Sequence, residues 1–159
     1  MKRIDEIIKS LNKYPNDIWW LETIQKIIEK DLSELEKKIN YKFPKDFRYF
    51  LLKYNWISIP WEYVYWIKKD TSKILPIDIY NNYITEHDKK IANPMPKYLV
   101  PFSPNGRWDH YCFNKKDNKI YFWQHDCSDY SWNPNYECDI FTEWLENSIN
   151  ESLEVLLED

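Results

Sequence analysis

The stretch "NYKFPKDFRYFLLKYN" (residues 40–55) decides the fold, because it predicts a short helix with one strongly apolar face. Pro44 suits the first turn of that helix, where its missing N–H would have had no partner. The apolar stripe that must lie against a core consists of Phe43, Phe47, Phe50, Leu51 and Tyr54. No glycine follows the stripe, so we expect Asn55 to adopt the left-handed conformation that ends the helix.

Helical patterns precede this stretch. Residues 2–12 repeat isoleucine and leucine at the spacing of a helix with one buried face. Asp31 followed by Glu34 is the pattern of a capping box, so we expect a second helix to begin at Asp31. Residues 18–29 fit either a helix or an extended segment, and both alternatives stay open.

After residue 58 the apolar residues alternate as they do in strands. In chain order we predict strands at 61–68, 73–80 and 97–102, with a surface helix at 81–91, then a β-hairpin of 107–114 and 119–125, a loop at 128–138 and a helix from Asp139. This order indicates a single α+β domain over residues 1–159, in which an antiparallel β-sheet is flanked by N-terminal helices and a C-terminal helix.

Composition narrows the class of protein further. With 159 residues and 18% aromatic side chains, the chain can bury a core without metal or disulfide staples. Its single glycine excludes the glycine-rich phosphate loops of nucleotide-binding folds. Its three cysteines suit a reducing compartment, and no apolar run reaches the length of a membrane span or of a signal peptide's core. We therefore expect a cytoplasmic protein without a membrane partner.

The charges are distributed unevenly along the chain. All 22 Lys and Arg residues lie in residues 1–119, together with 16 of the 26 Asp and Glu residues. Residues 120–159 hold the other ten carboxylates and no Lys or Arg. In the simplest interpretation such a one-sign segment is a solvated face. In a functional interpretation it steers a basic partner toward the protein and repels nucleic acid.

Four segments carry a resemblance to a known family. In chain order they are "DLSELEKKINYKFPKDFRYFLLKYN" (31–55), "LVPFSPNG" (99–106), "DHYCFNKKDNKIYFWQHD" (109–126) and "DIFTEWLENSI" (139–149). Together they resemble the SUKH superfamily, the Smi/Knr-type domain, over residues 20–150. The residues at matching positions of the first segment are Glu36, Phe43, Pro44, Phe47, Phe50, Leu51 and Asn55. The resemblance implies a SUKH-like fold and a function in binding.

Two departures from the family pattern bring tryptophans into turns. The family's glycine after Asn55 is Trp56 here, and the glycine pair of the later turn is reduced to Gly106, which Arg107 and Trp108 follow. A partner-specific surface and a different packing of the core are both compatible with these tryptophans.

Members of this superfamily are commonly bacterial immunity proteins, which neutralise polymorphic toxins by docking onto them. The resemblance therefore implies a non-enzymatic antitoxin that needs no cofactor or metal and whose partner is a cognate toxin, a basic nuclease domain. From the charge pattern we place the docking surface on the segment after the hairpin. It comprises Asp126, Asp129, Tyr130, Trp132, Tyr136, Glu137 and Asp139. Alternatively, Tyr130 and Trp132 fold under the loop as core.

Two other classes of function stay open. A regulatory protein-interaction scaffold of the Smi/Knr type would share the fold. A small enzyme would use a Cys–His nucleophile at Cys112 or Cys127, or a zinc ion. The residues that could hold zinc are His110, Cys112, His125, Cys127 and Cys138. The sequence has no paired CxxC motif, so this pattern favours ordinary buried residues over a metal site.

Overall fold

The chain is described here by a computed structural model over residues 1–14, 19, 26–60, 62–65, 67, 78–88, 94–105, 107–126 and 134–157. In chain order its elements are α1 (Lys2–Ser10), the 3₁₀ turn η1 (Leu11–Lys13), α2 (Glu29–Ile39), α3 (Lys45–Lys53), β1 (Ile57–Ile59), β2 (Glu62–Val64), α4 (Ile79–Glu86), β3 (Leu99–Pro104), β4 (His110–Asn114), β5 (Ile120–Trp123), β6 (Asn135–Cys138) and α5 (Phe141–Leu157). Within these residues, no helix is both long and apolar enough to cross a bilayer.

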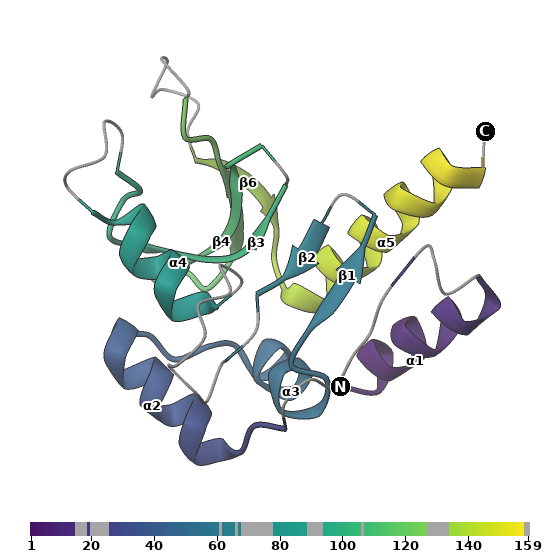
Figure 1. The fold of residues 1–159 in the computed structure, drawn as a ribbon, viewed down its shortest axis with the longest axis horizontal. Coiled ribbons are helices and arrows are strands. Elements are labelled where there is room, and N and C mark those ends of the chain that lie inside the picture. Colours follow the sequence, from purple (N-terminus) through teal and green to yellow (C-terminus); the bar gives the residue numbers. More distant parts are fainter. Residues whose placement is uncertain are drawn as a thin grey trace.

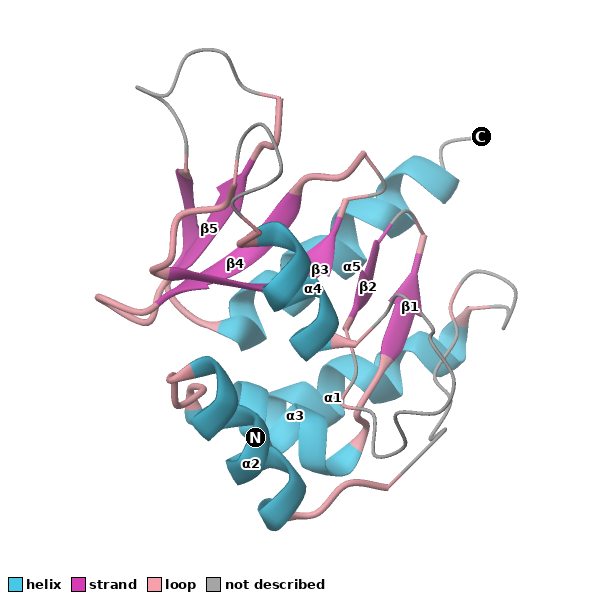
Figure 2. Ribbon diagram, turned by 60° about the vertical axis from the view of Figure 1, so that its left-hand side comes forward, coloured by secondary structure: helices cyan, strands magenta, loops and turns pink. Residues whose placement is uncertain are grey.

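The strands form two antiparallel sheets, as Figures 1 and 2 show. Strands β3, β4, β5 and β6 make a four-stranded meander, and β1 and β2 make a hairpin. The hairpin meets the meander at Tyr65, whose backbone N–H donates to the Phe102 carbonyl oxygen at 2.8 Å. In Figure 2, α4 lies in front of the meander and α5 lies behind it. The expected α+β class, with N-terminal helices and a C-terminal helix around an antiparallel sheet, is confirmed.

The apolar stripe of α3 forms the centre of the core. The ring of Phe47 is fully buried and packs against five other phenylalanine rings. They are Phe43, Phe50, Phe102, Phe113 and Phe141, at centroid distances of 4.8 to 6.4 Å. Since these rings come from the segment before α3, from α3 itself, from β3 and β4 and from the start of α5, the stretch at residues 40–55 holds helices and sheet together. A smaller buried cluster on the α4 side of the sheet joins Met95, Leu99, Cys112 and Trp123.

Asparagines end helices in place of glycine, as predicted. Asn55 follows α3 with a φ of 62°, and its N–H donates to the Phe50 carbonyl oxygen at 3.2 Å. Asn40 after α2 and Asn118 in the β4–β5 turn have φ values of 50° and 61°. The chain therefore uses an asparagine where the left-handed region favours glycine.

The predicted start of α2 was wrong by two residues. The helix begins at Glu29, and the carboxylate of Asp31 accepts the Ile28 N–H at 2.8 Å. Asp31 thus lies at the third position of the helix, where it reaches back as the acidic member of a capping box does, and it is not the first residue. Pro44 lies one position outside α3, next to Lys45.

The meander confirms the predicted hairpin and the strand of "KYLVPF", but the predicted loop at 128–138 was wrong in its last part. Residues Asn135–Cys138 form β6, which pairs with β5 at the edge of the sheet. Turn-forming residues precede β6 in the sequence, and β6 depends on β5 for its pairing. The local sequence therefore did not indicate a strand there. Ile79 and Tyr80 open α4 and do not end a strand. Most of 18–29, and residues 73–77, lie outside the described residues.

Candidate functional site: an acidic docking surface

The described residues include four of the seven predicted docking residues. Asp126 follows β5, Tyr136 and Glu137 lie on β6, and Asp139 comes directly after β6. Asp129, Tyr130 and Trp132 lie outside the described residues. All four are exposed.

Tyr136 and Asp139 belong to one end of the sheet. The carboxylate of Asp139 pairs with the Lys119 ammonium at 2.6 Å and accepts the Tyr136 hydroxyl at 3.1 Å. The hydrogen bond from Lys119 lowers the pKa of Asp139 below its ordinary value. Lys119 precedes β5 and Asp126 follows it, so Asp139 and Asp126 lie at opposite ends of that strand. The charge of Asp139 is already balanced within the chain.

Glu137 belongs to a different group, because successive residues of a strand face opposite sides of the sheet. Its charge interacts with Glu151 on α5 and with Glu62 on β2. We call Glu62, Glu137 and Glu151 the carboxylate cluster. These residues are distant in sequence, and β2, β6 and α5 bring them together.

Both Glu62 and Glu137 have a pKa raised above the ordinary value. Burial of the carboxyl is the main cause for Glu62; the hydroxyls of Ser148 and Tyr111 oppose it, and the charges of Glu151 and Glu137 reinforce it. Glu137 is an exposed residue whose carboxyl is partly desolvated by its neighbours, and its pKa is raised by this desolvation and then by the charge of Glu151. In the described part of the chain, the buried Oε2 atom of Glu62 has no hydrogen-bond partner. The carboxylate cluster therefore holds like charges that repel one another in a partly desolvated place.

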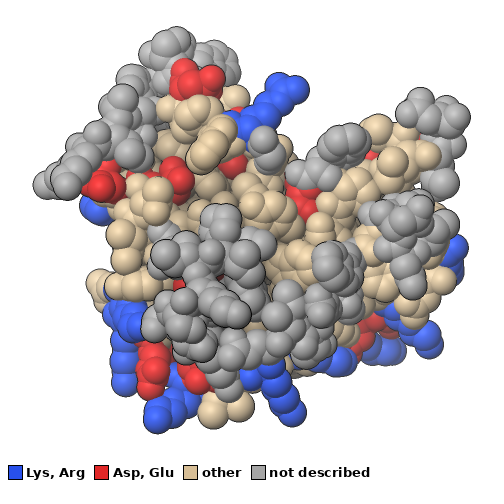
Figure 3. Space-filling view, viewed as in Figure 1, with Lys and Arg blue, Asp and Glu red and all other residues tan. Residues whose placement is uncertain are grey.

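The charged side chains are unevenly distributed over the face that Figure 3 shows. In Figure 3, lysine and arginine atoms gather along the lower edge, where Figure 1 places α1, α2 and α3. The outline is hollowed between the upper end of the meander and the C-terminal end of α5, and acidic atoms lie at the base of this hollow. A cationic group that enters the hollow would be attracted by the carboxylates at its base and repelled by Arg107 at its rim.

In the described part of the chain, the side chains of His110 and Cys112 have other partners than each other. His110 Nδ1 lies 3.0 Å from the Tyr65 hydroxyl, and His110 Nε2 lies 3.3 Å from a carboxylate oxygen of Glu86. The Cys112 thiol faces the sulfur of Met95 at 3.8 Å, and complete burial raises its pKa far above the ordinary value. Because the thiolate is the nucleophile, Cys112 is poorly suited to nucleophilic catalysis.

Among the described residues, the predicted zinc ligands His110, Cys112, His125 and Cys138 do not form one group of possible ligands. The Cys138 thiol donates to the Ile140 carbonyl oxygen, and burial raises the pKa of Cys138 to about 12. Cys127 lies outside the described residues. A different group, consisting of Asp109, His125 and Asp126, brings three possible ligand atoms within 4.8 Å of one another. Asp109 already accepts both the backbone N–H and the Nδ1–H of His125, at 3.1 and 2.9 Å, and Asp126 is the next residue after His125, so hydrogen bonding and adjacency in sequence account for the proximity.

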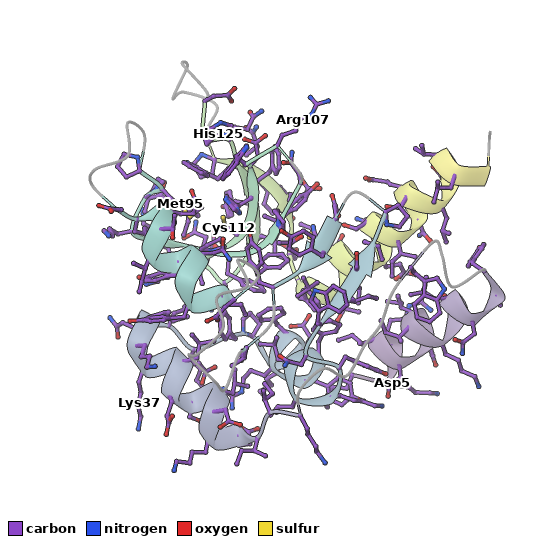
Figure 4. All side chains as sticks on the ribbon, in the orientation of Figure 1. Asp5, Lys37, Met95, Arg107, Cys112 and His125 are labelled. Carbon is purple, nitrogen blue, oxygen red and sulfur yellow. The ribbon has the colours of Figure 1, made fainter. Side chains whose placement is uncertain are left out.

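The two unexpected tryptophans have different environments. Trp56 is 8% exposed and so belongs to the buried part of the protein, whereas Trp108 is 78% exposed. Different core packing thus explains Trp56, and it does not explain Trp108. Arg107, beside Trp108, lies with His125 at the upper end of the meander in Figure 4.

Sequence reasoning missed Glu62 and Glu151 as members of the site. Glu62 interrupts an aromatic strand, "WEYVYW", and a carboxylate in such a strand is a signal that could have identified it. Glu151 is one of several carboxylates on α5, and nothing in its local sequence distinguishes it.

Comparison with protein families supports the resemblance noted in the sequence. The family model described as "SMI1-KNR4 cell-wall", SUKH_6, matches residues 29–145. A comparison with curated proteins found no match. The matched region runs from the first residue of α2 into the first half of α5 and contains both sheets. The chain belongs to the SUKH family of SMI1-KNR4 domains.

Proposed function

We propose that this chain is an immunity protein that binds and neutralises a cognate bacterial toxin, a basic nuclease domain, through an acidic and aromatic surface. It acts in the cytoplasm as a binding protein, without catalysis or a cofactor. Family membership supports a binding role, because the resemblance described above implies docking onto toxins. The surface consists of the carboxylate cluster and of exposed Asp126, which follows β5.

The carboxylate cluster is the observation that carries this proposal. The carboxylates of Glu62 and Glu137 lie close enough to each other and to Glu151 for their like charges to repel, and partial desolvation makes the ionised forms of Glu62 and Glu137 costly. Such an arrangement reduces the stability of the free protein, and cations from a partner would relieve the repulsion. A nuclease must grip polyphosphate and is therefore usually basic around its active site. An acidic inhibitor can occupy that site, and the opposite charges accelerate association.

A regulatory scaffold of the Smi/Knr type is the second candidate. It would use the same acidic surface on a protein unrelated to toxins, so binding alone does not separate the two functions. Inhibition of a nuclease does, because only the immunity function requires it. Genomic neighbourhood gives a further criterion, since a large secreted-toxin gene directly upstream favours immunity.

The test uses the C-terminal toxin domain encoded by the gene next to that of this chain. A catalytically inactive form of the domain is titrated with the chain by calorimetry at low and high salt, and the active form is assayed for nuclease activity with and without the chain. We expect a complex that weakens as salt rises, and loss of nuclease activity at equimolar chain. Absence of binding would contradict the proposal, and binding without inhibition would favour the scaffold.

A further inference from the structure

Trp108 is the most exposed tryptophan among the described residues. It lies in the turn between β3 and β4, and 78% of its surface is accessible. Isolated exposed apolar residues are common on protein surfaces, so exposure by itself needs no explanation. Here, however, the backbone of the same residue is also unusual.

The backbone of Trp108 has a φ of 69°, in the left-handed region that favours glycine. A bulky residue there is an outlier, because its Cβ crowds the neighbouring peptide. The other described residues with positive φ outside glycine are Asn40, Asn55 and Asn118. Asparagine tolerates this conformation far better than tryptophan does. Trp108 therefore bears a conformational cost that burial of its side chain does not offset.

Hydrogen bonds hold the turn in this shape. The Asn105 N–H donates to the Asp109 carbonyl oxygen at 3.1 Å, and the Arg107 N–H donates to the Asn105 side chain at 3.0 Å. The carboxylate of Asp109 is buried and accepts two hydrogen bonds from His125. This network ties Asn105, Arg107 and Asp109 to the end of β5, so hydrogen bonds hold the residues beside Trp108. A rigid anchor loses less conformational freedom on binding than a flexible one.

The surroundings of Trp108 indicate the chemistry of a ligand. The carboxylates of Asp126 and Asp109 lie together at His125, which binds the same turn. They outnumber the one exposed cation that the described residues place beside the indole, Arg107. Several lysine ammonium groups of the described residues lie over tyrosine rings. Within the same residues, no lysine lies over the ring of Trp108. Tryptophan is the aromatic side chain that binds cations best. A face of the indole is thus open to a cationic side chain from outside.

We infer that Trp108 is the anchor by which this chain holds its cationic protein partner, with a lysine or arginine of the partner against the indole. This inference rests on the proposed function and names a specific residue for the same surface. It explains why a tryptophan occupies a position that favours glycine: the side chain contributes to the complex and not to the free protein.

The experiment compares Trp108→Gly and Trp108→Asn with the unmodified chain. Both variants remove the indole, and both tolerate the left-handed backbone. We expect their urea midpoints to be equal to or higher than that of the unmodified chain. Calorimetry with the inactive toxin domain should show affinity at least about 30-fold weaker, the loss typical of a hot-spot tryptophan. Ile28→Ala is the control, because it removes an exposed apolar side chain from the other end of the molecule and should leave the affinity unchanged.

The outcomes separate this inference from the proposed function. If the unmodified chain binds the toxin domain and both Trp108 variants bind it equally well, the inference is wrong and the proposed function stands. If the variants unfold at clearly lower urea concentrations, Trp108 supports the free protein and the inference is again wrong. If the unmodified chain does not bind, the proposed function fails, and with it the partner assigned to Trp108.

Discussion

The side chain of Asn55 pairs with the backbone of Ile67 through two hydrogen bonds. Asn55 Nδ2 donates to the Ile67 carbonyl oxygen at 3.2 Å, and the Ile67 N–H donates to Asn55 Oδ1 at 3.0 Å. Both residues are buried. The residue that ends α3 therefore also supplies hydrogen-bond partners to the chain beyond β2. Glycine could adopt the same backbone conformation, but it could not make this pair.

Replacement of Asn55 by glycine should accordingly destabilise the protein. Asn55→Gly keeps the left-handed backbone but leaves the buried Ile67 N–H and carbonyl without these partners, so we expect a loss of about 2 kcal/mol in the free energy of unfolding. Asn55→Ala should cost about 1 kcal/mol more, because alanine is strained at positive φ. Urea denaturation measures both. Asn40→Gly is the matched control, because Asn40 is exposed and has a φ of 50°. This replacement should change the free energy of unfolding by no more than about 0.5 kcal/mol. Equal effects at Asn55 and Asn40 would contradict this role.

The unsuitability of Cys112 for nucleophilic chemistry leads to a second prediction. Cys112→Ala removes the thiol, and the proposed function requires that protection of cells against the cognate toxin persist. His110→Ala tests the histidine on the same strand, β4, in the same way. We expect both variants to protect at the level of the unmodified chain when they are expressed at equal amounts, with a stability cost of about 1 kcal/mol for the core cavity at Cys112. Loss of protection by a variant that remains folded would revive the enzymatic alternative.

Much of the fold could be predicted because its signals are local. The apolar stripe of α3, its asparagine terminus and the β4–β5 hairpin depend on residues close together in sequence. Strand β6 was missed because its propensity is weak and its pairing with β5 is irregular, with a register shift between Ile120 and Tyr121. Pairing of this kind is determined by the neighbouring strand and not by the local sequence.

The site was less predictable than the fold for a related reason. The acidic bias of residues 120–159 identified Glu137 as a candidate, but its neighbour Glu62 comes from the half of the chain with a basic excess. Only the packing of β2 beside the meander and α5 places the two together. Conversely, Asp139 looked like a free carboxylate in the sequence, and Lys119 neutralises it in the structure.

The raised pKa of Glu62 gives a pH-dependent prediction. A carboxyl whose pKa is higher in the folded state than in the unfolded state lowers stability at pH values above both, and it has no effect at pH values below both. Glu62→Gln removes this penalty, so the variant should be more stable than the unmodified chain at pH 7. The difference should shrink as the pH falls and vanish below the ordinary glutamate pKa of about 4.3. Thermal unfolding from pH 4 to pH 7 measures it.

Glu34→Gln is the control for that series, because Glu34 is an exposed residue on α2. Its effect on the unfolding temperature should be small and nearly independent of pH. A Glu62→Gln variant that is less stable than the unmodified chain at pH 7 would show that the carboxylate is needed for its interactions with Ser148 and Tyr111.

Reversal of charge on the acidic surface should slow association with the toxin domain. In the variant with Asp126→Lys and Glu137→Lys, two attractive carboxylates become repulsive cations. We expect the association rate with the inactive toxin domain to fall by about tenfold or more at low salt and to depend less steeply on salt, while dissociation changes less. Stopped-flow fluorescence at two salt concentrations resolves these rates. Glu34→Lys, on the opposite side of the molecule, should leave the association rate nearly unaltered. If Glu34→Lys lowered the association rate as much as the double variant does, net charge alone, and not this surface, would steer the partner.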